Sequence, residues 1–394
     1  MYIMKRIALF LCTVLFTAPV FAIDLLRDAD IEHAFAELSR PVLQAAGLSP
    51  KSIKILLLND KKLNAFIIDN KHIFISSGLF LSTNNAEMFQ SIIAHEAAHI
   101  ANGHLTRRMQ NMSVASTAST FGIALALMTG AFSENHELGL PLAIGASSSA
   151  RGILLSHTRA EESAADHAAM RYLARSNIDG KGMIDVLNIF IGQDSLSASR
   201  QDPYLRTHPS NRDRKRALEA LIKTKEAIPR NRKNAYWHER AVGKLSAFIR
   251  RPEWTLKRAG NSKSADVRHL RRAVAFSRQG KVSSALNEMK KAQAQRPNDP
   301  YLQELRAELL MRNKHFAQSA KEYAKAVSMD PDNALALSGY GRALLANKQT
   351  AKALFVLKEA RDADFRNTRL MRDLAVTYSK LGKNNMAALV TAER

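Results

Sequence analysis

Residues 91–104 read SIIAHEAAHIANGH and contain the pattern HExxH, with His95, Glu96 and His99 at its three fixed positions. Residues four apart lie on one face of a helix, so the two imidazoles can share one cation while Glu96 projects beside it. The alanines and apolar residues around the pattern favour a helix. This arrangement is typical of zinc hydrolases, and the alternative is an amphipathic helix with two hydrogen-bonded histidines.

The pattern needs a third ligand from elsewhere in the chain. A metzincin would place Gly and His three and six residues after His99, but Asn102 and Leu105 occupy those positions. His104 misses the ligand position by one residue, and such a slip rotates a side chain by about 100° around a helix. We therefore interpret His104 as a residue of the second face or of the helix cap, and expect a carboxylate from a separate element.

Residues 157–173, HTRAEESAADHAAMRYL, supply such carboxylates. Glu162 and Asp166 are four apart and share a helix face, so Glu162 can complete a His, His, Glu zinc site while Asp166 accepts a hydrogen bond from a ligating histidine. Small residues that would let a neighbouring helix approach closely surround them: Ala164, Ala165, Ala168 and Ala169. The alternative is a solvated acidic turn in which Glu162 pairs with Arg159.

HEAAH, followed about sixty residues later by TRAEESAAD, resembles the gluzincin metallopeptidase family that contains the heat-shock protease HtpX and the CAAX prenyl protease. In that family the pattern Arg-x-x-Glu-x-x-Ala-Asp gives the third ligand and matches Arg159, Glu162, Ala165 and Asp166. The neighbouring Glu161 is five residues from Asp166 and fits the pattern less well.

Two segments before the HExxH pattern, Asn64-Ala65-Phe66 and Gly78-Leu79, are also similar to strand signatures of that family. Lys71 stands where the family usually has Gly, so the conformation of this turn is left open while the site is unaffected. The resemblance implies one zinc ion per chain, bound by His95, His99 and Glu162. It also implies that Glu96 is the general base and that Asp166 orients a ligand.

A later segment, Tyr204 to Pro209, ends in Thr-His-Pro before a basic stretch and is again similar to the family. His208 precedes a proline, so we expect it to be extended and in a loop. Three roles remain open for it. His208 could stabilise an oxyanion, bind zinc as a fourth ligand that holds the enzyme inactive, or be an ordinary turn residue.

The N-terminal 22 residues carry Lys5 and Arg6, an apolar run and small residues at the end, as a cleavable signal peptide does. The only cysteine, Cys12, lies inside this segment, so we expect an exported chain without disulfides. Removal of residues 1–22 lowers the net charge of the chain from +22 to +20. No nucleic-acid-binding fingerprint accompanies this charge, which leaves a solvated surface or peripheral attachment to the membrane or envelope.

The segments around the site predict a mixed α/β unit. A helical pattern runs from Asp24 to Ala46, and strand patterns cover Ser52–Leu58, Leu63–Ile68 and Lys71–Ser77. A strand directly before the HExxH helix could hold a substrate peptide along an exposed sheet edge. Ser113–Ala150 is poor in charge, which indicates buried helices, a lid or a membrane-dipping hairpin.

A repeat of 34 residues occupies the C-terminal third. Small residues recur at that period, and Pro297 and Pro331 follow the first two units, as in tetratricopeptide repeats. The recurring small residues are Ala273, Ala307, Gly341 and Ala375; Ala285, Ser319, Ala353 and Ala387; and Ala292, Ala326 and Ala360. We expect four units, the last incomplete at Arg394. Trp237, Phe248 and Trp254 are expected to join this array to the preceding part.

The predicted chain is therefore mostly α-helical and has four parts. They are a signal peptide (1–22), an α+β gluzincin zinc metalloprotease domain with a small β-sheet (23–225), a helical linker (226–264) and an α-solenoid of tetratricopeptide repeats (265–394). This combination resembles periplasmic proteases of the family. The resemblance implies a zinc endopeptidase of the periplasm that degrades misfolded or stalled outer-membrane proteins and assists their assembly.

The partners implied are unfolded or misassembled polypeptides, and the outer-membrane assembly machinery through the repeats; no nucleic acid is expected. Two other functions remain. A chaperone or scaffold could keep a zinc-stabilised fold without turnover, although the presence of Glu96 argues against it. A pure repeat adaptor would need no metal site at all.

Overall fold

The computed structural model describes residues 24–108, 158–190, 200–208, 211–223 and 228–394. The expected signal peptide and the low-charge stretch Ser113–Ala150 lie outside the described residues. No helix among those described is both long and apolar enough to cross a membrane.

A four-stranded mixed sheet stands at the start of the described chain, in the order β1-β2-β4-β3. Its strands are β1 (Leu25–Leu26), β2 (Lys54–Leu58), β3 (Ala65–Ile67) and β4 (His72–Ser76). β2 runs parallel to β4, whereas β1 pairs antiparallel with β2 and β3 pairs antiparallel with β4. The three predicted strands are therefore present.

Two expectations about this region need correction. The helix predicted from Asp24 begins later, as α2 (Ala29–Ala45), because Leu25 and Leu26 pair with β2 and the side chain of Asp28 caps the helix at Ile31 N, 3.0 Å away. The strand before the HExxH helix is also not an edge. β4 is buried along its whole length between β2 and β3, and the helix α3 (Ser77–Ser82) follows it. The edge strand on that side is β3.

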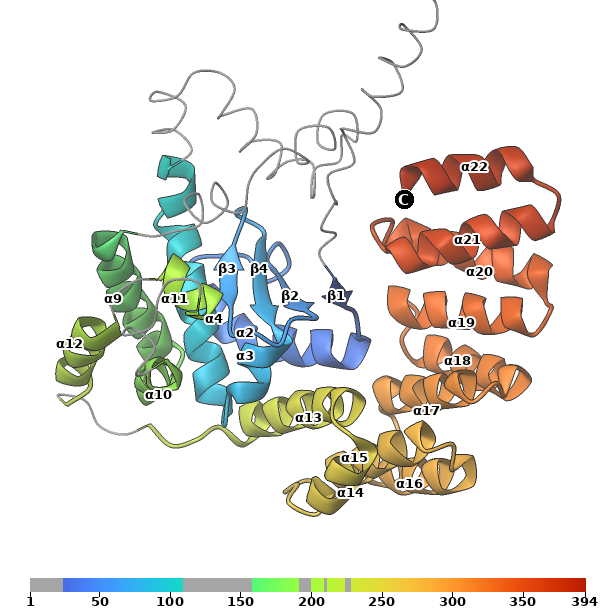
Figure 1. The fold of residues 1–394 in the computed structure, drawn as a ribbon, viewed down its shortest axis with the longest axis horizontal. Coiled ribbons are helices and arrows are strands. Elements are labelled where there is room, and N and C mark those ends of the chain that lie inside the picture. The colour runs from blue at the N-terminus through green and yellow to red at the C-terminus, as the bar shows by residue number, and fades with distance from the viewer. Residues whose placement is uncertain (1–23, 109–157, 191–199, 209–210, 224–227) are drawn as a thin grey trace, which may run out of the picture.

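The HExxH pattern lies on α4 (Ala86–Ala101), the central helix of this part. Every residue from Ala86 to Ile100 is buried, because α2, α10 (Lys181–Ile189), α9 (Arg159–Arg175) and β3 all pack around it. Figure 1 shows α4 between the sheet and α9. At Gly182 on α10, an added Cβ would lie 2.4 Å from Glu87 O, so only glycine permits this approach to α4.

The predicted close approach of a neighbouring helix to α9 is confirmed, and that helix is α4: Ala165 and Ala168 pack with Ala98 and Tyr172. Ala164, which was expected to share that contact, is exposed instead. Two further helices complete this part, α11 (Pro203–Thr207) and α12 (Asn211–Lys223).

The segment expected to be a linker forms α13 (Arg232–Ile249) and α14 (Pro252–Ala259). Trp237, Ala241 and Leu245 of α13 belong to the same apolar core as α2 and α4, so this helix is an integral part of the packed core rather than a spacer. Phe248 packs on the first repeat, whereas Trp254 lies between arginines. Of the three expected anchors, Trp237 and Phe248 therefore join the two parts.

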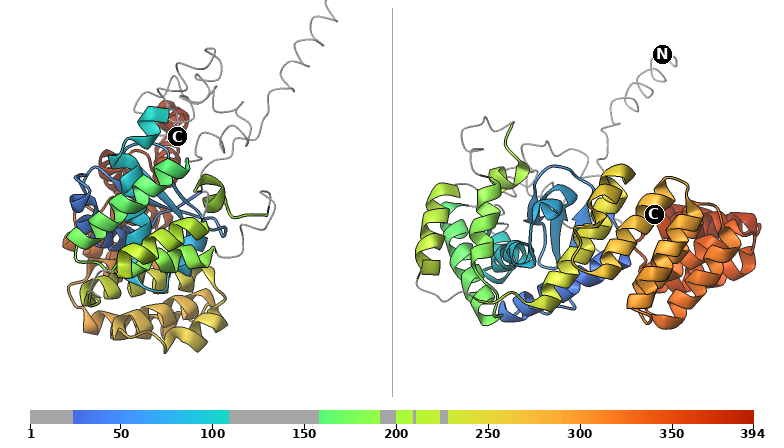
Figure 2. Two further views of the ribbon diagram at one scale, coloured as in Figure 1. Left: turned by 90° about the vertical axis from the view of Figure 1, so that its left-hand side faces the viewer. Right: turned by 90° about the horizontal axis from the view of Figure 1, so that it is seen from below.

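Four helix pairs follow: α15 (Ala265–Arg278) with α16 (Val282–Gln295), α17 (Pro300–Arg312) with α18 (Phe316–Met329), α19 (Ala334–Ala346) with α20 (Thr350–Ala363), and α21 (Thr368–Lys380) with α22 (Asn384–Glu393). They stack side by side in Figures 1 and 2. Small residues keep the helices close: a Cβ at Gly341 would lie 2.5 Å from Leu357. The last helix has 10 residues against 14 in α16, α18 and α20.

Candidate metal centre

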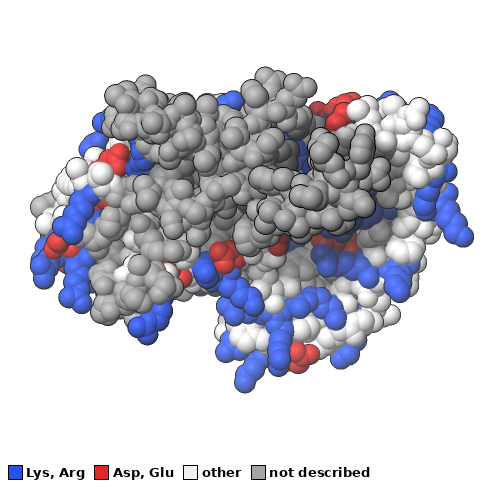
Figure 3. All heavy atoms as spheres, turned by 45° about the horizontal axis from the view of Figure 1, so that its top comes forward, with Lys and Arg blue, Asp and Glu red and all other residues white. Residues whose placement is uncertain are grey.

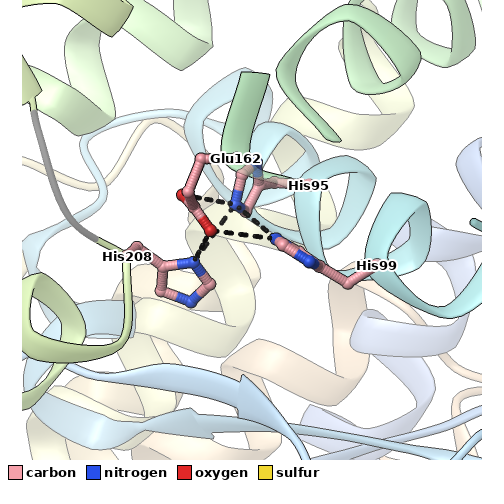
Figure 4. A group of neighbouring side chains, drawn as sticks. All are labelled: His95, His99, Glu162 and His208. Carbon is pink, nitrogen blue, oxygen red and sulfur yellow. Dashed lines mark hydrogen bonds and ion pairs between the residues drawn. The ribbon is translucent and has the colours of Figure 1, made fainter. Parts of the chain in front are cut away.

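Four buried side chains converge where α4, α9 and the end of α11 meet: His95, His99, Glu162 and His208. His95 and His99 come from successive turns of α4, Glu162 from the first turn of α9, and His208 from the residue that ends α11. One ligand atom from each lies within 4.8 Å of all the others. Figure 4 shows them pointing toward one shared centre.

The spacing of these atoms fits a tetrahedral cation site. Ligand atoms of such a site are about 3.3 Å apart when the metal bonds are about 2.0–2.1 Å long. His95 Nε2 lies 3.1 Å from His99 Nε2 and 3.3 Å from His208 Nδ1. Glu162 Oε1 lies 3.3 Å from His99 Nε2 and 2.9 Å from His208 Nδ1. Three imidazoles and one carboxylate are also the donor set that zinc prefers.

The second ring nitrogens of the two HExxH histidines have partners as well. His95 Nδ1 lies 3.1 Å from Asp166 Oδ1, which is the contact that the spacing of Glu162 and Asp166 predicted. His99 Nδ1 lies 2.9 Å from Nδ1 of His104, and His104 is only 3% exposed. His104 therefore contacts a candidate ligand directly, which corrects its interpretation as a second-face or cap residue.

A buried arginine that the sequence analysis missed connects the two carboxylates of α9. Arg214 on α12 binds Asp166 through Nε and Nη2, both at 2.8 Å, and its Nη1 lies 2.5 Å from Glu162 Oε2. Arg214 is 7% exposed. Glu162 therefore does not pair with Arg159, as the alternative reading required, and Arg214 is the cation that holds it in place.

Glu96 lies beside the cluster with its carboxylate fully buried. Neither of its oxygens accepts a hydrogen bond from the part of the chain that the structure describes, and His208 Nε2 lies 3.5 Å from Oε1. Such a group is costly unless it has a ligand or a reacting atom to serve. Glu161, the competitor of Glu162, instead caps α9 with Thr158 and pairs with Arg108.

The electrostatic balance favours a positive charge in the cluster. Burial alone lowers the pKa of His95, but its contacts with Asp166 and Glu162 raise that pKa to about 9. Burial likewise lowers the pKa of His99, and in this case burial prevails. The pKa of Glu162, which burial alone would raise, is held well below its usual value by His208 and Arg214. Complete burial raises the pKa of Glu96.

Comparison with known proteins agrees with this geometry. The family model described as Peptidase family M48 matches residues 26–222, half of the chain, and a tetratricopeptide repeat model matches residues 310–375. The predicted combination of a metallopeptidase domain and tetratricopeptide repeats is confirmed.

Individual relatives are more distant. The beta-barrel assembly-enhancing protease of Escherichia coli K12 is 25% identical over 185 residues, which is 47% of this chain and 37% of that protein. The putative beta-barrel assembly-enhancing protease of Vibrio cholerae is 24% identical over 189 residues, 48% of this chain and 38% of the relative. The alignments thus span well under half the length of these relatives.

Among solved structures, a MamA structure overlaps 40% of this chain and 94% of its own, with 16% identity and a TM-score of 0.32, too low to support any conclusion. The family match carries more weight, because it covers β2 to β4, α4, α9 and all four residues of the cluster. On the strength of that match, this chain belongs to peptidase family M48.

Proposed function

We propose that this chain is a zinc-dependent endopeptidase that hydrolyses peptide bonds of misfolded or stalled envelope proteins. The observation that carries the proposal is the placement of Glu96. Its fully buried carboxylate, which accepts no hydrogen bond from the described residues, lies beside a four-donor cluster of tetrahedral spacing. A purely structural metal site does not need such a group.

In the proposed mechanism His95, His99 and Glu162 hold one zinc ion, with Asp166 orienting His95 and Arg214 holding both acids of α9. When bound, zinc would supply a Lewis acid that lowers the pKa of water and polarises the scissile carbonyl. Glu96 takes the proton of the attacking water and returns it to the leaving amine nitrogen. Its raised pKa suits this exchange, because a general base works best when its pKa approaches the working pH.

The substrate would enter along β3. This strand forms one end of the sheet and packs against both α4 and α11, the elements that carry His95, His99 and His208. An extended peptide that pairs with Ala65–Ile67 would gain main-chain hydrogen bonds whatever its side chains. Such recognition suits an enzyme that acts on many unfolded chains.

His208 would control access to the site. A catalytic zinc site keeps one position open, whereas here Nδ1 of His208 occupies the fourth position of the cluster. We infer that His208 must move away before a substrate carbonyl can enter. The structure as it stands would then represent the inactive state, and the mobile contact would be that between His208 and Glu162, 2.9 Å long.

The substrates, partners and location are proposed by analogy with the relatives. The relatives named beta-barrel assembly-enhancing protease suggest envelope proteins as substrates, and a repeat array suggests contact with partner proteins such as the outer-membrane assembly machinery. A periplasmic location would follow from the signal peptide expected in residues 1–22.

The test is cleavage of casein by the zinc-loaded protein. Glu96→Gln should lower the rate by about 100- to 10,000-fold while zinc stays bound, because the general base is lost and the ligands are kept. His208→Ala should raise the rate, because the fourth position opens. Glu161→Gln, an exchange at the neighbouring acid that caps α9 outside the cluster, should change little. Zinc-loaded protein without Glu96-dependent cleavage would contradict the proposal and leave a metal-stabilised chaperone.

A further inference from the structure

The positive charge of this protein is unevenly distributed. Residues 250–281, which run from the end of α13 through α14 and α15, contain ten lysines and arginines against two acids. Their net charge is +8 out of +22 for the whole chain. We refer to residues 250–281 as the basic surface. More than a third of the excess charge thus lies on less than a tenth of the chain.

Seven of these cations are exposed, and none forms an ion pair with a carboxylate within the described parts of the chain. They are Arg250, Arg251, Lys257, Arg258, Lys263, Arg278 and Lys281. Figure 3 shows Lys and Arg side chains crowded along the lower edge of the molecule, on the side where α14 to α16 lie in Figure 1.

The two acids of the basic surface offset only a small part of its positive charge. Asp266 is buried and accepts a hydrogen bond of 2.5 Å from Tyr236, and Glu253 accepts one of 2.9 Å from Gln279. Neither pairs with a cation of this surface within hydrogen-bonding distance. The exposed charges therefore repel one another in the free protein, and an anionic partner would relieve that repulsion.

A tryptophan stands among these charges. Trp254 on α14 is partly exposed, and the guanidinium groups of Arg250 and Arg258 lie 5.7 and 4.8 Å from its ring centroid. Tryptophan collects at the level of lipid headgroups, where its ring is apolar on one side and hydrated on the other. Arginine beside it matches phosphate oxygens.

We propose that the basic surface docks this protein onto an anionic phospholipid membrane, with Trp254 seated at the headgroup level. Charge complementarity and the tryptophan together favour a lipid surface over an acidic protein or a nucleic acid. A nucleic acid would be bound by a row of stacking aromatics or by side chains that enter a groove, whereas the basic surface carries a single, partly exposed indole, on α14.

The attachment would be peripheral and reversible. Each basic residue near an anionic bilayer contributes about a fivefold gain in partitioning at low salt, and the gain falls as salt screens the charges. Loss of three exposed cations should therefore weaken binding by about 100-fold. The proposal stands independently of proteolysis, since none of these residues lies at the metal centre.

The experiment measures co-sedimentation of the full chain with vesicles of phosphatidylglycerol and phosphatidylethanolamine, beside vesicles of phosphatidylcholine. The test variant combines Arg251→Gln, Lys257→Gln and Arg258→Gln. The matched control combines Lys321→Gln, Lys352→Gln and Lys358→Gln, which removes the same charge from exposed positions on α18 and α20. The N-terminal residues are the same in every variant, so they cannot cause a difference in vesicle binding. A larger loss in the test variant than in the control therefore reports the basic surface.

A second measurement is independent of total charge. Trp254 and Trp237 are the only tryptophans, and Trp237 is 7% exposed. Emission should shift to the blue on phosphatidylglycerol vesicles and be quenched by brominated lipid, and both effects should disappear in Trp254→Phe.

The expected result is salt-sensitive binding to anionic vesicles that the test variant loses about 100-fold and the control retains. Equal losses in both variants, or binding without a Trp254 signal, would overturn the proposal, because total charge alone would then explain attachment. Tighter binding to double-stranded DNA than to anionic vesicles would also overturn it and would identify a nucleic-acid surface.

Discussion

His99 and His104 face each other through the same ring nitrogen, Nδ1, at 2.9 Å. One proton must lie between the two atoms, since two bare nitrogens would repel and two N–H groups would clash. His99 can bind a metal through Nε2 as a neutral imidazole only if its Nδ1 carries the proton. His104 must then be the neutral acceptor, and burial, which lowers its pKa, favours that state. His104 thus positions a ligand.

Replacing His104 by Ala should weaken zinc binding by about 10- to 100-fold, because the acceptor that orients His99 is lost. His104→Asn, whose side-chain oxygen can take the place of Nδ1, should restore most of the affinity. Competition with a chromogenic chelator measures both values. His167→Ala, at an exposed histidine on α9, is the control. Equal zinc affinity in His104→Ala and the wild type would refute a positioning role.

The sequence predicted those residues of the buried cluster whose spacing is set within one helix, and it failed where the chain bends. His95 is four residues from His99, and Glu162 is four residues from Asp166. Helix geometry alone therefore brings the members of each pair to one face. His104 was misinterpreted because α4 ends at Ala101 and Gly103 has a φ of 64°, so that helical rotation no longer applies beyond it.

Arg214 carried a signal that the sequence analysis did not use. It is one of four basic residues from Arg212 to Arg216, but it precedes Leu218 and Leu221 by four and seven residues, the spacing of one helix face. Only the packing of α12 against α9 shows which carboxylates it binds. The site was thus predictable where local geometry suffices, and tertiary packing decided the rest.

At the scale of single elements, α13 shows how a helix expected to be a linker becomes part of the core. His238 on this helix is 5% exposed and lies 2.8 Å from Thr83 Oγ1, at the end of α3. Thr83 donates its hydroxyl proton to Phe80 O, so it must accept from His238 Nε2–H. Burial lowers the pKa of His238 to about 4, because the charged imidazolium would be desolvated.

This contact predicts a pH-dependent loss of stability. The unfolded chain binds a proton at His238 near pH 6.5, whereas the folded chain resists it until about pH 4. The contribution of neutral His238 to the free energy of unfolding is therefore complete above pH 6.5. It is lost as the pH falls toward 4, and the loss is at most about 3 kcal/mol. His238→Gln, which keeps the donor and cannot titrate, should flatten this part of the curve.

Urea unfolding across this pH range makes the comparison, with His315→Gln, an exposed histidine, as the control. If the free energy of unfolding falls equally steeply with pH in the wild type and in His238→Gln, groups other than His238 cause the loss of stability.

At the scale of the whole molecule, a buried arginine on α13 connects the metallopeptidase part to the repeats. Arg240 is fully buried, with Nε 2.8 Å from Asp30 Oδ1 on α2. Its Nη1 and Nη2 lie 2.5 and 3.0 Å from Asp299, which caps α17 of the second repeat. Arg27 also reaches Asp364, beyond α20, at 3.0 Å. The 34-residue period predicted the repeats, but it carried no information on which surface of the metallopeptidase part they would pack against.

Removing Arg240 should destabilise the protein strongly. Arg240→Ala takes away the buried cation that Asp30 and Asp299 share and leaves them only Lys244 and Arg296, at 3.5 and 3.2 Å. Breaking such a buried ion pair costs up to about 3–5 kcal/mol. Urea unfolding measures this loss, and small-angle scattering should show the repeats displaced. Lys233→Ala on the same helix removes a cation that is 67% exposed in its contact with Glu37, and should cost under about 1 kcal/mol. Similar losses in the two variants would argue against Arg240 as the connecting residue.

We expect one zinc ion per chain, held by His95, His99 and Glu162, and the metal content of purified variants is the measurement that decides it. Elemental analysis of the purified protein should give one zinc per chain in the wild type and in Glu161→Gln, whose side chain caps α9 away from the cluster. Glu162→Gln should lose the zinc. Retention of zinc in Glu162→Gln, or its loss in Glu161→Gln, would show that Glu162 is not the third ligand.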